Sequence, residues 1–256
     1  SSLSSIEIPS GVTSIESCAF YNCKSLASIE IPSGVTSIGG SAFGGCSSLA
    51  DVTFGENSQL TSIESYAFSG CSSLSSIEIP SGVTSIESCV FRGCSSLSSI
   101  EIPSGVTSIG YEAFFGCSSL SSIEIPSGVT SIGYYTFYGC SSLADVTFGE
   151  NSQLTSIGSY AFENCSSLAS IEIPSGVTSI ESYAFRGCSS LSSIEIPSGV
   201  TYIGYDAFYG CSSLADVTFG ENSQLTSIEW EAFYDCSSLA SIEIPSGVTS
   251  IGSSAF

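Results

Sequence analysis

Residues 94–109 read Cys-Ser-Ser-Leu-Ser-Ser-Ile-Glu-Ile-Pro-Ser-Gly-Val-Thr-Ser-Ile. The same stretch recurs with few changes every 23 or 25 residues along the whole chain of 256 residues. A fixed period above about 20 residues is typical of a solenoid, in which each repeat buries its apolar side against its neighbours. The sequence therefore predicts one solenoid domain over residues 1–256.

The recurring cysteine divides the chain into eleven units, which start at residues 1, 23, 46, 71, 94, 117, 140, 165, 188, 211 and 236. Three units (46–70, 140–164 and 211–235) have 25 residues, because Phe-Gly-Glu-Asn-Ser-Gln-Leu replaces Ile-Pro-Ser-Gly-Val. The first unit begins one residue late and the last stops two residues early, so no polar capping repeat is present. Since solenoids need caps, we expect a fragment of a longer chain or one segment of an end-to-end assembly.

Each unit predicts two short strands. In the first full unit, residues 28–31 alternate polar and apolar side chains, which indicates a half-buried strand. Pro32 ends this strand because it cannot donate to a ladder, and residues 35–38 form a second extended piece. After the Ala-Phe pair, a Gly, Asn or Asp precedes the next cysteine, so we expect a short helical turn that ends in a left-handed residue. The predicted fold is β-rich, with a parallel sheet on one face and helical turns on the other.

The unit pattern Leu-x-x-Ile-x-Ile-Pro-x-x-Val-x-x-Ile-(Gly/Glu)-x-x-Ala-Phe-x-x-Cys resembles the leucine-rich repeat of BspA-like (treponemal-type) surface proteins. The resemblance covers all eleven units. It implies a curved, right-handed leucine-rich-repeat solenoid in an extracellular or surface-attached protein, often an adhesin for host matrix proteins or other cells. It implies no particular site, because the function of that family is not encoded in fixed residues.

Composition excludes several function classes. The chain has 24 acidic residues against Lys24, Arg92 and Arg186, which gives a net charge of −21. A nucleic-acid partner is not expected, because phosphate neutralisation needs Lys and Arg. There is no His, so nothing activates the abundant Ser residues, and we expect no enzyme activity. No apolar run approaches the roughly 18 residues of a membrane span.

Ten of the twelve cysteines begin units and form one column. We expect them to be buried small apolar thiols, because side chains that point the same way miss disulfide geometry and cannot surround zinc. Cys18 and Cys89 differ, since they stand just before the Ala-Phe step, where other units have residues such as Ser41 or Glu112. We expect both thiols to be exposed, either as inter-chain cross-linking sites or as neutral surface residues.

A column of acidic residues follows the centre of the first strand. Its members are Glu7, Glu30, Glu78, Glu101, Glu124, Glu172, Glu195 and Glu243. Thr53, Thr147 and Thr218 replace Glu in the units of 25 residues. The column could attract a basic partner or cations, and calcium is the candidate because it accepts clustered carboxylates. The alternative is a solubilising face, and no other cofactor is expected.

The units differ most around Ala-Phe, where outward positions carry an aromatic ridge. Its members are Tyr111, Phe115, Tyr134, Tyr135, Tyr138, Tyr202, Tyr205, Tyr209, Trp230 and Tyr234. Tyr and Trp dominate interface hot spots, so the ridge is the predicted partner-binding surface. The rings could instead stack on one another and stabilise the solenoid.

The sequence thus predicts a non-catalytic extracellular repeat scaffold that mediates protein–protein or cell-surface adhesion. The partner would be a protein or a cell-surface ligand. The alternative is a structural subunit that binds copies of itself and stacks end to end into a filament or sheath.

Overall fold

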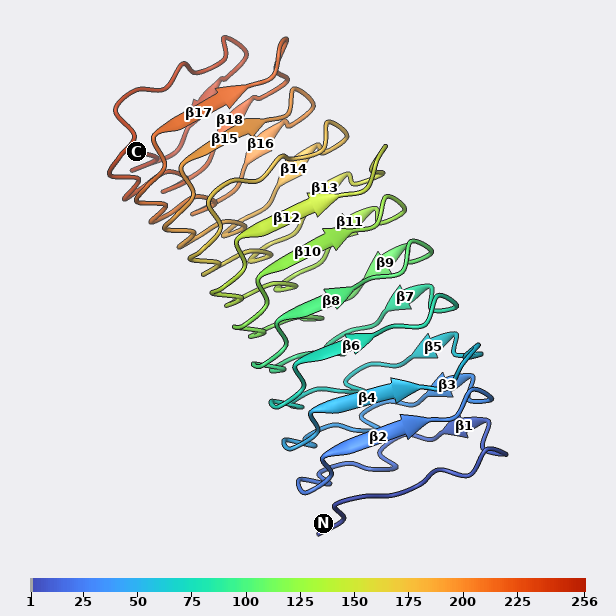
Figure 1. Cartoon of the computed structure of the whole chain (residues 1–256). Coiled ribbons are helices and arrows are strands. Elements are labelled where there is room, and N and C mark those ends of the chain that lie inside the picture. The colour runs from blue at the N-terminus through green and yellow to red at the C-terminus, as the bar shows by residue number, and fades with distance from the viewer. Residues whose placement is uncertain (1) are drawn as a thin grey trace.

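The computed structural model describes residues 2–256. Figure 1 shows the coils stacked one on another into an elongated, curved rod, with the two termini at opposite ends. Among residues 2–256, each coil has a turn, a second strand and a longer turn segment, and eight of the eleven coils also have a first strand. All strand pairs are parallel, as the repeat predicts.

The first strands lie on one side of the rod. They are β2 (Ser28–Ile31), β4 (Asp51–Phe54), β6 (Ser76–Glu78), β8 (Ser99–Glu101), β10 (Ser122–Ile125), β12 (Asp145–Phe148), β15 (Ser193–Ile196) and β17 (Asp216–Phe219). They pair two by two, as β2–β4, β6–β8, β10–β12 and β15–β17. In β2, Ile29 and Ile31 are buried and Glu30 is exposed, so the predicted alternation is confirmed.

The second strands form a more continuous column (Figure 1). They are β1 (Ser14–Ile15), β3 (Ser37–Ile38), β5 (Ser62–Ile63), β7 (Ser85–Ile86), β9 (Ser108–Ile109), β11 (Ser131–Ile132), β13 (Ser156–Ile157), β14 (Ser179–Ile180), β16 (Tyr202–Ile203), β18 (Ser227–Ile228) and β19 (Ser250–Ile251). Sheets of three strands (β1-β3-β5) and eight strands (β7 to β19) make up this column. The register sets Ile against Ile, for example Ile157 against Ile180.

The expected helical turns are wrong, because residues 2–256 contain no helix. The turn segment is instead a chain of tight turns with left-handed residues at Tyr66 and Gly70 in unit 3. The amides of Ala67 and Ser69 close turns onto carbonyls three residues back, whereas those of Tyr66, Phe68 and Gly70 donate to the next coil. In an α-helix every amide donates to a carbonyl of the same helix. Here every second amide donates to the neighbouring coil, so the segment does not form a helix.

A spine of phenylalanines fills the centre of the rod. Eleven Phe rings, one from each coil between Phe20 and Phe256, stack with centroid distances of 5.1 to 5.9 Å. The recurring Leu, Ile, Val and Ala side chains surround the spine and are mostly buried. Each coil therefore completes its core only through its neighbours.

The cysteine column is buried, as expected, and the structure shows what its thiols do. From Cys46 to Cys236, nine thiols each donate to a Phe carbonyl one coil earlier, at 3.1 to 3.2 Å. All twelve cysteines are free. Burial is the largest cause that raises the pKa of these thiols, which reaches about 12 for Cys140 and Cys236.

Serine and threonine hydroxyls add a further set of contacts between coils. Thr36 and Thr61 donate their hydroxyls to the carbonyl of the matching Thr one coil earlier, at 3.1 and 3.2 Å. Ser98 and Ser121 do the same on another line of the surface.

Among residues 2–256, no helix is long and apolar enough to cross a membrane.

The buried thiols predict a steep loss of stability in alkali. Their folded pKa lies above the unfolded value of about 8.5, so their contribution is complete below that pH and is lost as the pH rises. Each thiol that ionises only in the unfolded chain removes about 1.4 kcal/mol per pH unit. The free energy of unfolding, measured with urea and a reductant, should change little from about pH 7 to 8 and fall sharply above about pH 9.

The matched control is the double variant Cys117→Ala/Cys140→Ala. Cavities lower its stability at every pH, but the loss per pH unit should be smaller by about 2.8 kcal/mol. An unchanged slope would show that the thiols do not control the alkaline transition.

Candidate functional site

The units differ from one another mainly in the turn segment. Three of its positions vary, and unit 5 shows them: the pre-turn position (Tyr111), the left-handed position (Glu112) and the post-phenylalanine position (Phe115). The remaining positions of the segment supply the buried Ala and Phe side chains of the core. These three positions therefore carry most of the chemical differences between the units.

The left-handed position is occupied by a non-glycine residue in every unit. Its φ lies between 52 and 63° at Cys18, Ser41, Tyr66, Cys89, Glu112, Tyr135, Tyr160, Tyr183, Asp206, Glu231 and Ser254. This conformation costs an L-residue roughly 1 kcal/mol or more. Hydrogen bonds to the next coil hold the backbone there, such as Tyr135 N–H to the Ser159 carbonyl at 3.1 Å. The side chain is therefore presented in one direction whatever its chemistry.

Units 5 to 8 carry a continuous group of rings, which we call the tyrosine cluster. It consists of Tyr111, Phe115, Tyr134, Tyr135, Tyr138, Tyr160 and Tyr183. Tyr135 lies at its centre, with ring centroids of Tyr134 and Tyr160 at 4.2 and 4.4 Å. The rings of Tyr160 and Tyr183 stack at 4.4 Å. Tyr111 and Tyr134 keep about 40% of their surface exposed, so the cluster faces the solvent.

Two members of this cluster, Tyr160 and Tyr183, do not belong to the aromatic ridge that the sequence predicts. Both occupy the left-handed position, directly above Tyr135 in the stack. Aligning the units on the Ala-Phe pair would have placed all three tyrosines in one column. The rings stack on one another, as the alternative reading of the ridge expects, while Tyr111 and Tyr134 leave exposed surface, and partner binding by the ridge stays a prediction.

Units 9 and 10 carry a second group, the tryptophan patch, which consists of Tyr205, Tyr209, Trp230 and Tyr234. The rings of Tyr209 and Tyr234 stack at 5.5 Å. Tyr205 and Trp230 are 50% and 44% exposed. Tyr202 lies apart from both groups, because it belongs to β16 and pairs with Ser227 of β18. Burial and a hydrogen bond with Glu181 raise its pKa.

The two arginines of the chain occupy equivalent places. Arg92 Nη1 lies 2.7 Å from Glu112 Oε2, and its Cζ lies 4.6 Å from the ring centroid of Phe115. Arg186 similarly lies 4.8 Å from the Tyr209 ring centroid, with Nε 4.0 Å from Asp206 Oδ2. In both cases the guanidinium stacks on a ring and pairs with an acid of the following coil. We call this arrangement the arginine module.

The second arginine module has fewer hydrogen bonds than the first. Arg186 is shared between Asp206 and Glu163, each 4.0 Å away, and both carboxylates are buried. Burial raises the pKa of both acids, and Arg186 opposes the shift. Among residues 2–256, Asp206 Oδ1 is a buried side-chain oxygen without a hydrogen-bond partner. The site therefore has more acceptors than donors.

The expected exposure of both Cys18 and Cys89 is only half right. Cys18 is exposed, but Cys89 is fully buried and its thiol donates toward Glu112 Oε2 at 3.7 Å. Burial raises the pKa of Cys89. Glu112 Oε2 also accepts a hydrogen bond from Arg92, so this thiol lies beside the arginine module. Cys89 is therefore excluded as an accessible cross-linking site.

The acidic column lies exposed along the first strands, as predicted. Three of the four strand pairs set Glu against Thr, and only Glu78 and Glu101 face each other directly. This spacing limits repulsion between like charges. Within residues 2–256, no three His, Cys, Asp or Glu side chains are placed to share a metal ion. Calcium binding on the column therefore has no geometric support here.

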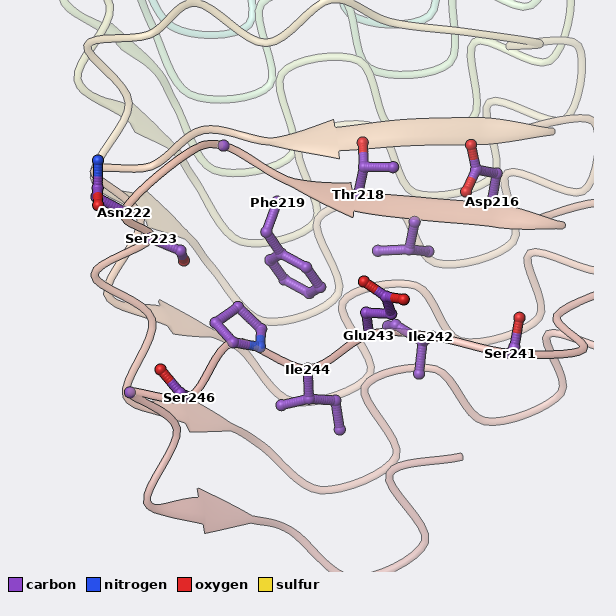
Figure 2. A pocket seen from close by; sticks show the side chains of 14 residues that line it. Asp216, Thr218, Phe219, Asn222, Ser223, Ser241, Ile242, Glu243, Ile244 and Ser246 are labelled. Atoms are coloured by element: carbon purple, nitrogen blue, oxygen red, sulfur yellow. The ribbon is translucent and has the colours of Figure 1, made fainter.

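Open hollows lie where neighbouring first strands do not pair. Figure 2 shows the hollow of about 750 Å³ between β17 and residues 241–247, with Asp216, Thr218 and Glu243 among the residues that line it. A similar hollow of about 630 Å³ lies between β8 and β10. Their lining offers carboxylates, hydroxyls and apolar strand residues but no activated nucleophile.

Comparison with known proteins identifies the family. The family model described as BspA type leucine rich repeat region matches in six copies, over residues 1–118, 61–167 and 155–256. The chain belongs to this family of leucine-rich-repeat scaffolds. No protein of curated function matches it.

Solved structures of leucine-rich-repeat proteins are similar to the chain. A leucine-rich repeat protein from Bacteroides ovatus is 30% identical, with a TM-score of 0.63 over 96% of this chain and 67% of that one. The T. pallidum leucine-rich repeat protein is 32% identical, with a TM-score of 0.58 over 64% of this chain and 77% of that one. The pneumococcal vaccine antigen PcpA, at 24% identity and a TM-score of 0.58, covers 94% of this chain and 66% of that one, and shares the fold.

The thiol environments predict selective alkylation. Under native conditions at about pH 8, iodoacetamide should modify Cys18 rapidly, because this thiol is exposed and the reagent can reach it. Cys89 and the cysteine column should react only after unfolding. Peptide mass spectrometry before and after addition of denaturant measures this, and native modification of Cys89 at the rate of Cys18 would contradict its burial.

Proposed function

We propose that the protein is a non-catalytic extracellular scaffold that binds a protein or cell-surface partner through the tyrosine cluster. The observation that carries this proposal is the cluster itself, seven rings in mutual contact across four units on a rigid stack. Rigid tyrosines provide large contact area at low entropic cost and are enriched among interface hot spots.

Two further observations support the extracellular part of the proposal. Membership of the BspA-type family is consistent with a surface protein. Eleven of the twelve thiols are buried, so they are protected against the oxidation and disulfide exchange of an oxidising environment. A net charge of −21 keeps the scaffold soluble and favours partners with basic surfaces.

Binding to an array of purified matrix and cell-surface proteins tests this proposal. The wild-type protein should bind at least one of them with a Kd of about 10 μM or lower, measured by biolayer interferometry. The double variant Tyr134→Ser/Tyr138→Ser should weaken that binding at least about tenfold, because it removes two neighbours of the central Tyr135.

The matched control is Tyr21→Ser/Tyr66→Ser, which removes two exposed tyrosines outside the cluster. Thermal melts of both double variants show that each is folded at the assay temperature. The proposal fails if no protein of the array binds, or if the control variant weakens binding as much as the cluster variant does.

A further inference from the structure

The chain's own arginines show what the turn segment can bind. In units 5 and 9 an acid at the left-handed position and a ring at the post-phenylalanine position hold the guanidinium of the preceding coil. Those pairs are Glu112 with Phe115 and Asp206 with Tyr209. Acid and ring together satisfy the charge and the flat face of a guanidinium group.

Unit 10 has the same two residues without an arginine. Glu231 occupies its left-handed position and Tyr234 its post-phenylalanine position. The preceding coil places Tyr209 over Tyr234, which supplies a ring and no positive charge. No ion pair among residues 2–256 involves Glu231. In unit 10 the Tyr209 ring thus takes the place that the guanidinium has in the arginine modules, and Glu231 is left without a cation.

The surroundings of Glu231 are those of a cation-binding surface. The preceding residue, Trp230, is 44% exposed, and Trp offers the strongest aromatic face for a cation. Tyr205, one coil earlier at the same pre-turn position, is 50% exposed. Asp206 donates its backbone N–H to the Trp230 carbonyl, and its buried Oδ1 has no donor of its own. Exposed rings, an acid without an ion-pair partner and a buried carboxylate oxygen without a hydrogen-bond donor thus occur in neighbouring coils.

We propose that the tryptophan patch and Glu231 bind an arginine-containing basic segment of a partner protein. The guanidinium would lie against the Trp230 or Tyr205 ring and pair with the Glu231 carboxylate, as Arg92 does with Phe115 and Glu112. Arginine fits better than lysine, because its planar group stacks on rings and forms paired hydrogen bonds with a carboxylate. This inference rests on the proposed function and adds the chemistry of the partner.

Trp230 is the single tryptophan of the chain, so its fluorescence reports on this surface alone. The probe is a short glycine-rich peptide with two arginines, titrated into the intact protein at about 0.15 M salt, where distant charges are screened. Trp230 emission should change saturably. The same peptide with lysines in place of arginines should bind at least about threefold more weakly.

Two substitutions with the same change in charge separate the site from the overall acidity. Glu231→Gln should weaken binding of the arginine peptide at least about fivefold, whereas Glu243→Gln, on the acidic column, should leave it within about twofold. Tyr205→Ser should also weaken binding, and Tyr66→Ser, at an exposed tyrosine outside both groups of rings, should not. Both replace tyrosine by the serine that other units carry there.

The inference is overturned if Trp230 emission does not change saturably, if the lysine peptide binds equally well, or if Glu243→Gln weakens binding as much as Glu231→Gln. These outcomes are distinct from failure of the proposed function. A partner from the protein array that still depends on Tyr134 and Tyr138 would preserve the proposed function while the arginine site is rejected. If no protein of the array binds, the proposed function fails, and the peptide titration still tests the arginine site by itself.

Discussion

Registered pairing of each coil with the next is the constraint on which the rest of the structure depends. Backbone hydrogen bonds join the coils on both strand sides and along the turn segments. Because every layer has the same outline, identical side chains fall above one another and build the phenylalanine spine and the thiol column. No single coil has a core of its own, so stability is shared between neighbours.

This constraint separates the repeated scaffold from the variable positions of the turn segment. The repeated residues face the core or bridge the coils. Most side chains at the three variable positions of the turn segment reach the surface, but Cys89, Glu112 and Asp206 are buried. At the left-handed position the backbone is held from the neighbouring coil, so Cys, Ser, Tyr, Glu and Asp all occur with nearly the same φ. Chemistry at the surface can therefore change without a change in the path of the chain.

Much of this architecture could be predicted from the sequence, because the strands and the cysteine column depend on spacing. The alternation of residues 28–31 and the left-handed Gly45 or Asn22 before a cysteine are local signals. The turn segment was mispredicted as helical, because its amides pair with another coil. The burial of Cys89 is not predicted either, since its thiol contacts Glu112 of the next coil. The sequence of a single unit does not indicate such contacts between coils.

The arginine modules have a consequence for how such an array can diversify. Each module is formed by two successive units, because the arginine comes from one coil and its acid and ring from the next. Exchange or loss of a whole unit between near-identical repeats keeps the register and hence the fold. Loss of unit 5, for example, would place Arg92 next to Tyr135 and Tyr138 of unit 6 in place of Glu112 and Phe115. Recombination between repeats would thus rearrange which surface residues meet between neighbouring coils, on a rod that still folds.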